Sequence, residues 1–411
     1  MVYTKTYGNG LRVIVKEMPG LMSVTMGILV GTGSSAERDD EDGISHFIEH
    51  MQFKGTDKRT AFEVSDAFDR IGAQVNAFTG KDSTVYYAKS TRDHAEEAFE
   101  ALSDLFLHAT YPDDEMEREK GVICEEISMN EDTPEDLCLD LLATAYFGAE
   151  NYGRNILGPA ENVKSFTKSA VAAYKKARYC PENIVISFAG GIEKNKAFDL
   201  ADKYFSELEK GEFESRERKV VFPSKTLQKT KPIEQTHLAL AFPSFERNHP
   251  LSDAMAAMCG VLGGNMSSRL FQEVREKRGL AYSVYSYTSA YEECGVLTIY
   301  AGVNPKKAND ALSAIQAVID DLRKNGVTDE EFMRSREQMK SNLFFSNENT
   351  SSQMLLYGKH LLQRGEVFDF EEKLRKINAV KREDLLSAIE YAFGGGRCAK
   401  AAVGNLEHLK L

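Results

Sequence analysis

Several features that mark other classes of protein are missing from this sequence of 411 residues. No stretch approaches the roughly 18 consecutive apolar residues of a membrane-spanning helix, so we expect no membrane contact. The N-terminal segment has neither the apolar core of a secretion signal nor an Arg- and Ser-rich transit pattern. Neither a GxGxxG nor a GK[ST] phosphate loop is present, which disfavours a nucleotide-binding role.

The six cysteines lack any pairing pattern, because no CxxC occurs and their spacings are irregular. Scattered cysteines are typical of free thiols in a reducing compartment, so we expect a cytoplasmic protein. Acidic residues outnumber basic ones by 63 to 51, which gives a formal net charge of −12. This charge disfavours nucleic acid as a partner and favours cationic peptides.

The length of the chain predicts more than one domain. Strands and helices alternate through the first half, and the second half repeats the order of a strand, a helix, a hairpin and long helices. We therefore predict an α+β fold of two duplicated α/β sandwich domains, each a sheet flanked by helices. Residues 211–232 are charged and contain two prolines, so we interpret them as a linker between domains at 1–210 and 233–411.

The most informative motif is HFIEH, at residues 46–50. Histidines at i and i+4 lie one above the other on a helix, so His46 and His50 can share one tetrahedral metal ion. Helical periodicity places Phe47 and Ile48 on the apolar face and leaves the two histidines and Glu49 on the other. A surface helix that carries two solvated histidines would give the same pattern.

A catalytic zinc needs a third protein ligand and one open position. The acidic stretch at 117–132 supplies a candidate, because helical periodicity turns Glu126 and Glu119 inward and Glu125 toward water. Glu119 then lies two turns before Glu126, where it could accept a hydrogen bond from a ligand histidine. The alternative is a plain acidic surface helix.

The segments HFIEHMQFKGT, IGAQVNAFTGKDSTVYY and EREKGVICEEISMNEDTPEDL together resemble the pitrilysin/insulysin family of metallopeptidases. The resemblance covers essentially the whole chain and is strongest to the branch of mitochondrial processing peptidase and its bacterial relatives. In that family HxxEH is the inverted zinc motif. Its third ligand lies about 76 residues beyond the second histidine, and Glu126 follows His50 by 76 residues.

The resemblance implies a zinc endopeptidase with one Zn²⁺ per chain, held by His46, His50 and Glu126. It gives Glu49 the role of general base on a zinc-bound water and Glu119 a supporting role. It implies that the segment Asn76, Ala77 and Phe78 binds extended substrate by strand pairing.

In the second half, the resemblance points to Arg275 and Tyr282 as donors that stabilise the oxyanion and orient the substrate. Arg278 is the local alternative. The family encloses peptides in a clamshell of four related domains, and this chain supplies two, or half. We therefore expect a homodimer in which Arg275 and Tyr282 of one copy reach the metal site of the other.

Three further questions are not decided by these residues. Some relatives are non-catalytic partner or scaffold subunits of processing-peptidase-like heterodimers, which usually lack part of the motif set that is present here. A His₂Glu site also suits manganese or cobalt, and affinity order alone does not decide which metal is held. The physiological substrate and the cleavage-site preference are not encoded in any motif.

Overall fold

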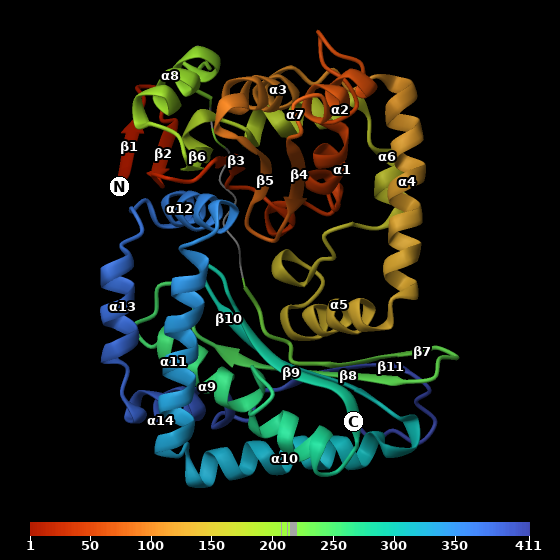
Figure 1. The fold of residues 1–411 in the computed structure, drawn as a ribbon. Coiled ribbons are helices and arrows are strands. Elements are labelled where there is room, and N and C mark those ends of the chain that lie inside the picture. Colours follow the sequence, from red (N-terminus) through yellow and green to blue (C-terminus); the bar gives the residue numbers. More distant parts are fainter. Residues whose placement is uncertain (207, 212, 214–219) are drawn as a thin grey trace. The chain divides into compact units, whose positions relative to one another are not determined.

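The computed structural model describes residues 1–411 except 207, 212 and 214–219, and the chain divides into two compact units. Both are visible in Figure 1. The first unit comprises Met1–Ile127, Asn155–Arg218 and Phe344–Phe368. The second comprises Ser128–Arg154, Lys219–Leu343 and Asp369–Leu411.

The first unit is built on a six-stranded sheet with the order β1-β2-β6-β3-β5-β4. Strands β2 and β6 are parallel, and the other neighbours are antiparallel. The central strands β3 and β6 are buried almost throughout, as expected for apolar runs covered on both faces. The strands are β1 (Val2–Thr6), β2 (Arg12–Glu17), β3 (Ser23–Val30), β4 (Gln74–Thr79), β5 (Thr84–Thr91) and β6 (Ile184–Gly190).

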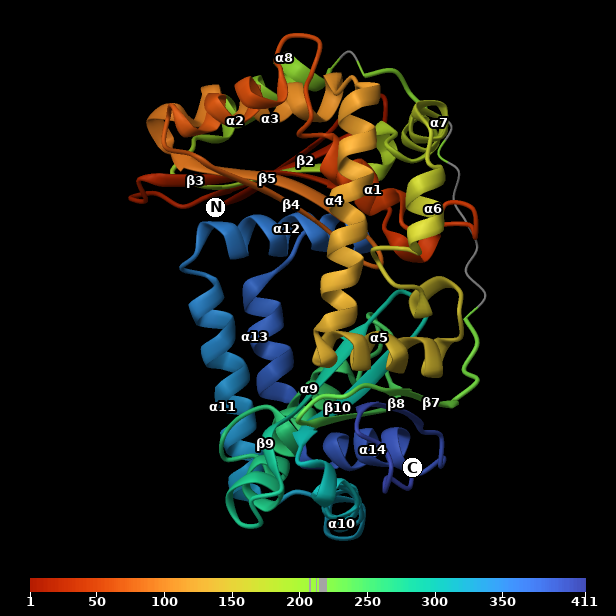
Figure 2. The same cartoon turned by 90° about the vertical axis from the view of Figure 1, so that its right-hand side faces the viewer.

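Helices cover both faces of this sheet. Figure 2 shows α2, α3 and α8 over one face and α12 under the other. The main core lies between the sheet and the first group of helices and is rich in phenylalanine. The helices are α1 (Ile44–Met51), α2 (Ala61–Asp69), α3 (Ala95–His108), α4 (Asp113–Asp132), α6 (Ala160–Ser165), α7 (Lys168–Arg178), α8 (Lys194–Phe205) and α12 (Thr350–Arg364).

The second unit has a five-stranded sheet with the order β7-β11-β8-β10-β9. Its strands are β7 (Thr226–Thr230), β8 (Thr236–Ser244), β9 (Ala281–Ala290), β10 (Gly295–Val303) and β11 (Ala399–Gly404). Its helices are α5 (Pro134–Phe147), α9 (Ser252–Gly263), α10 (Ala308–Asn325), α11 (Asp329–Ser346), α13 (Phe370–Ala379) and α14 (Arg382–Phe393). The last residues of α4 belong to this unit, and those of α11 belong to the first.

The sheet topology shows that the two halves of the chain share one fold. Strands β2 to β6 and strands β7 to β11 follow the same spatial order, and each series has one parallel pair, β2–β6 and β7–β11. The mixed α/β fold with two duplicated halves, which the sequence predicted, is therefore present.

The compact units are not continuous in sequence, which the predicted boundaries at 1–210 and 233–411 did not foresee. Helix α5, from the first half, packs on β8 and β11 of the second sheet. Helix α12, from the second half, packs on β3 and β6 of the first sheet. The expected linker at 211–232 also contains β7, and its residues 212 and 214–219 lie outside the described part of the chain.

The exchanged helix α12 approaches its sheet closely at Gly358. A Cβ atom there would lie 2.8 Å from Cδ1 of Leu29 and 2.9 Å from Cβ of Ser187. Both side chains are fully buried. We expect Gly358→Ala to lower the free energy of unfolding by about 1–3 kcal/mol through overpacking, seen as a lower urea midpoint.

The matched control is Gly121→Ala on the exposed side of α4, where an added Cβ meets nothing within 4 Å. Helix propensity alone should raise the free energy of unfolding there by up to about 1 kcal/mol. A stabilising effect at both positions would contradict the close packing of α12.

Candidate metal centre

Helix α1 separates an apolar face from a polar one, as its sequence predicted. Ile44, Phe47, Ile48 and Met51 are buried against the core, and the polar side chains lie on the other side. The helix starts after Gly43, whose φ of 96° is a left-handed conformation that favours glycine. The buried carboxylate of Glu37 accepts hydrogen bonds from the backbone N–H groups of Gly43 and Ser45, which fixes this start.

His46, His50 and Glu126 come together at one point, with their candidate ligand atoms within 4.8 Å of one another. Nε2 of His46 lies 3.7 Å from Oε2 of Glu126, and Nε2 of His50 lies 3.5 Å from the same oxygen. Two imidazole nitrogens and one carboxylate are a donor set that zinc prefers. The three residues that the sequence singled out as ligands therefore fit one metal ion.

The surrounding carboxylates orient His50. Oε1 of Glu119 lies 2.8 Å from its Nδ1, so that nitrogen carries the proton and Nε2 keeps a lone pair for a metal. The other oxygen of Glu119 forms an ion pair of 2.6 Å with Nζ of Lys54. Glu119 is almost fully buried, as its inward position on α4 predicted, whereas Glu125 is exposed. Sequence reasoning missed Lys54, because no periodicity links it to α4.

Electrostatics shifts the pKa values of the two histidines in opposite directions. Burial, assisted by the charge of His50, lowers the pKa of His46 to about 4. For His50, burial acts to lower the pKa, but the Glu119 hydrogen bond and the charge of Glu126 outweigh it, so the pKa is raised. A neutral His46 has a free lone pair at neutral pH, as a metal ligand requires.

Glu49 lies on the same face of α1 and is held by the end of β4. The hydroxyl of Thr79 donates a hydrogen bond of 2.6 Å to Oε2 of Glu49. Burial raises the pKa of Glu49, partly offset by the bonds from Thr79. A carboxylate with a raised pKa beside a metal centre has the properties of a proton acceptor.

The segment Asn76, Ala77 and Phe78 lies on β4, which is an edge strand of the first sheet. Alternation along the strand sends Ala77 toward the core under α1 and Phe78 toward a cluster with Leu29 on the α12 side. The edge position fits the predicted strand pairing with substrate, and that role stays a prediction.

Arg275 and Tyr282 lie in the second unit, in a π-helical turn at Phe271–Glu276 and at the start of β9. The Arg275 guanidinium lies 5.4 Å from the centre of the Tyr282 ring, so the two are neighbours. Tyr282 is 77% exposed. Their expected role at a metal site stays a prediction.

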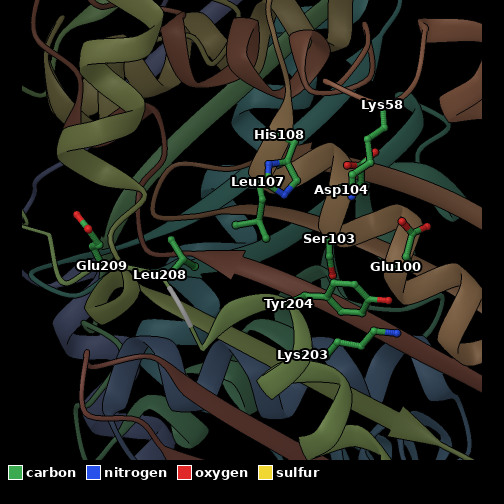
Figure 3. A pocket seen from close by; sticks show the side chains of 10 residues that line it. All are labelled: Lys58, Glu100, Ser103, Asp104, Leu107, His108, Lys203, Tyr204, Leu208 and Glu209. Carbon is green, nitrogen blue, oxygen red and sulfur yellow. The ribbon is translucent and has the colours of Figure 1, made fainter.

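One open cavity of about 430 Å³ lies elsewhere in the first unit (Figure 3). Side chains of α3 and α8 line it, among them Asp104, His108 and Tyr204. None of the candidate metal or catalytic residues is among its lining residues. The metal centre is therefore separate from this cavity.

Other expectations concern the chain as a whole. All six cysteines are free thiols in the structure, as their irregular spacing predicted. None of the helices in the described part of the chain has the length and apolar character needed to cross a bilayer.

The chain has two duplicated α/β halves, and in the first an HxxEH helix meets a glutamate that lies far away in the sequence. These features define a class of protein, the zinc-type metallopeptidases with the inverted motif. Residues 12–160 match the family model "Insulinase (Peptidase family M16)", and residues 165–339 match "Peptidase M16 inactive domain". The chain belongs to peptidase family M16.

Curated relatives and solved structures agree with this assignment. The chain is 42% identical to "Uncharacterized zinc protease YmxG" of Bacillus subtilis, over 93% of each chain. It is 34% identical to a protein of Streptomyces coelicolor, also named a zinc protease, over 98% of this chain and 89% of the other. A Helicobacter pylori protease has the same fold, with a TM-score of 0.92 at 22% identity, over 98% of this chain and 99% of the other.

The hydrogen bond between Glu119 and His50 should control metal affinity. We expect Glu119→Gln to weaken zinc binding by about 10- to 100-fold, because His50 loses a charged acceptor that orients it. Competition with a chromophoric chelator measures the change. Glu125→Gln, an exposed change one residue from Glu126, should leave the affinity as it is, and equal losses in both variants would contradict the assignment.

Proposed function

We propose that this protein is a zinc-dependent endopeptidase that cleaves peptides or unfolded segments. The main support for the proposal is that His46, His50 and Glu126 place their candidate ligand atoms close together. Glu49 is held nearby, on the same face of α1 as the two histidines. The names of relatives as zinc proteases support zinc as the metal. The free cysteines support a cytoplasmic location.

In this mechanism the chain binds, orients and moves a proton. A bound zinc ion would supply Lewis-acid polarisation of the scissile carbonyl and would lower the pKa of a coordinated water. Glu49 takes a proton from the attacking water on one carboxylate oxygen and passes it to the leaving amine. Glu119 keeps His50 in one tautomer throughout, and the edge of β4 aligns the extended substrate.

The second unit supplies the remaining groups in this proposal. The half-buried Arg275 and the exposed Tyr282 are neighbouring donors that can stabilise negative charge on the carbonyl oxygen. We infer a homodimer in which these donors act on the metal site of the partner copy. The net charge of −12 favours cationic peptides as substrates.

Replacing the general base separates metal binding from turnover. Glu49 is not among the three proposed ligands, so Glu49→Gln should bind about one zinc per chain, as the wild type does. Cleavage of a quenched basic peptide should fall by at least about 10²-fold, because the glutamine cannot accept the proton. Metal analysis and a fluorescence assay on the same preparations check both points.

Either of two results would contradict the proposal. Full activity of Glu49→Gln would remove Glu49 from the mechanism. A wild type that binds zinc and does not cleave would favour the alternative, a non-catalytic partner subunit of a heterodimer.

Mixing inactive variants tests whether two copies share one site. Arg275→Ala and Glu49→Gln should each be nearly inactive alone, since one lacks the oxyanion donor and the other the base. After subunit exchange at equal amounts, about a quarter of the sites would combine an intact Glu49 with an intact Arg275 of the partner copy. Activity should therefore recover to about that fraction of the wild type.

The control for this mixture is Arg278→Ala, the neighbouring alternative, which should stay active alone. A mixture that never exceeds its more active component would show that Arg275 does not act between copies. An active monomer in size-exclusion chromatography would contradict the shared site as well.

A further inference from the structure

Thr79 is the last residue of β4 and contacts Glu49 through its side chain. Its hydroxyl lies 2.6 Å from Oε2 of Glu49 and is the donor in that bond. Nothing in the HxxEH motif or in the periodicity of α1 indicates this contact, because Thr79 follows Glu49 by 30 residues and lies in a different element.

The free edge of β4 explains why this contact matters. The backbone N–H of Ala77 donates to Oδ1 of its own neighbour Asn76 at 2.8 Å, so this N–H points away from β5. Side and direction repeat every second residue along a strand, so the N–H of Thr79 points to the same free edge. That N–H also stabilises the carboxylate of Glu49.

Glu49 therefore occupies the next position of the ladder after Ala77. A peptide that adds to the edge can bond to Ala77, by displacing the Asn76 side chain. At Thr79 the edge meets the side chain of Glu49, whose Oε2 accepts the Thr79 hydroxyl. The spacing between the two positions is about 6.8 Å, two residues of an antiparallel strand.

We propose that Thr79 is a positioning residue that attaches the general base Glu49 to the end of the substrate-binding edge of β4. This inference rests on the proposed peptidase function. One strand then holds both the substrate and the base, so their spacing is fixed by the backbone. The hydroxyl of Thr79 holds Oε2 of Glu49, which restricts the rotation of the carboxylate.

Substitution by valine removes the hydroxyl and keeps the β-branched shape that suits a strand. Because a displacement of about 1 Å at a reacting group can reduce the rate by about 10²-fold, we expect Thr79→Val to lower kcat by about 10- to 100-fold. KM should change by less than about twofold and zinc content should not change, since neither substrate pairing at Ala77 nor the ligands are touched. Thr79→Ser keeps a hydroxyl and should recover most of kcat.

A double-mutant cycle separates positioning from a general loss of structure. In a Glu49→Gln background, Thr79→Val should cause no further loss of the residual activity, because the group that it positions is already disabled. Hydrogen exchange in the metal-free protein adds a measurement that does not depend on activity. Exchange of the Thr79 amide should be faster in Glu49→Ala than in the wild type.

The outcomes distinguish the two proposals. If the wild type cleaves, Glu49→Gln does not, and Thr79→Val keeps wild-type kcat, only the positioning role is overturned. A loss that Thr79→Ser shares in full, or an unchanged exchange rate of the Thr79 amide in Glu49→Ala, overturns it too. If the wild type does not cleave, or Glu49→Gln cleaves normally, the peptidase function fails and the positioning role fails with it.

Discussion

The division of α1 into an apolar and a polar face is the constraint on which the candidate metal centre depends. Burial of Phe47, Ile48 and Met51 fixes the rotation of a helix of only eight residues. Once that rotation is set, His46 and His50 can only face the side where Glu126 arrives on α4. A short helix has little intrinsic stability, so tertiary packing and the Glu37 contacts at its start decide its placement.

Around this helix, functional side chains have partners that form a hydrogen bond or an ion pair with them. Glu119 serves His50 and is itself balanced by Lys54, so the buried carboxylate is not left as an isolated charge. Thr79 serves Glu49 in a comparable way from the edge strand. The two glutamates of the site thus have different environments: one is tied to cations and the other to neutral donors. This difference agrees with the separate roles proposed above, support for Glu119 and proton transfer for Glu49.

Much of this site could be predicted from the sequence, because helical periodicity acts locally. The inward turn of Glu119 and Glu126 and the outward turn of Glu125 follow from the apolar residues beside them on α4. The contacts of Lys54 and Thr79 could not be predicted in this way. Each of these contacts joins two elements that come together only in the folded chain. No periodic pattern in the sequence indicates the distance between them.

The same limit applies to the domains. The order in which strands and helices follow one another along each half can be recognised from the sequence, because strands and turns have local signals. The packing of α5 on the second sheet and of α12 on the first sheet cannot be recognised from the sequence. Both helices are ordinary amphipathic segments whose partners lie far away along the chain. Boundaries drawn by composition at 1–210 and 233–411 therefore cut through both units.

The reciprocal packing of α5 and α12 has a consequence for synthesis. During translation the first sheet, with α1 above it, emerges without the helix that covers its other face. That cover is present only after residues 350–364 have left the ribosome, when most of the chain has been made. Neither half of the chain therefore contains all the segments of a complete unit, and a half made alone would lack one layer of its fold.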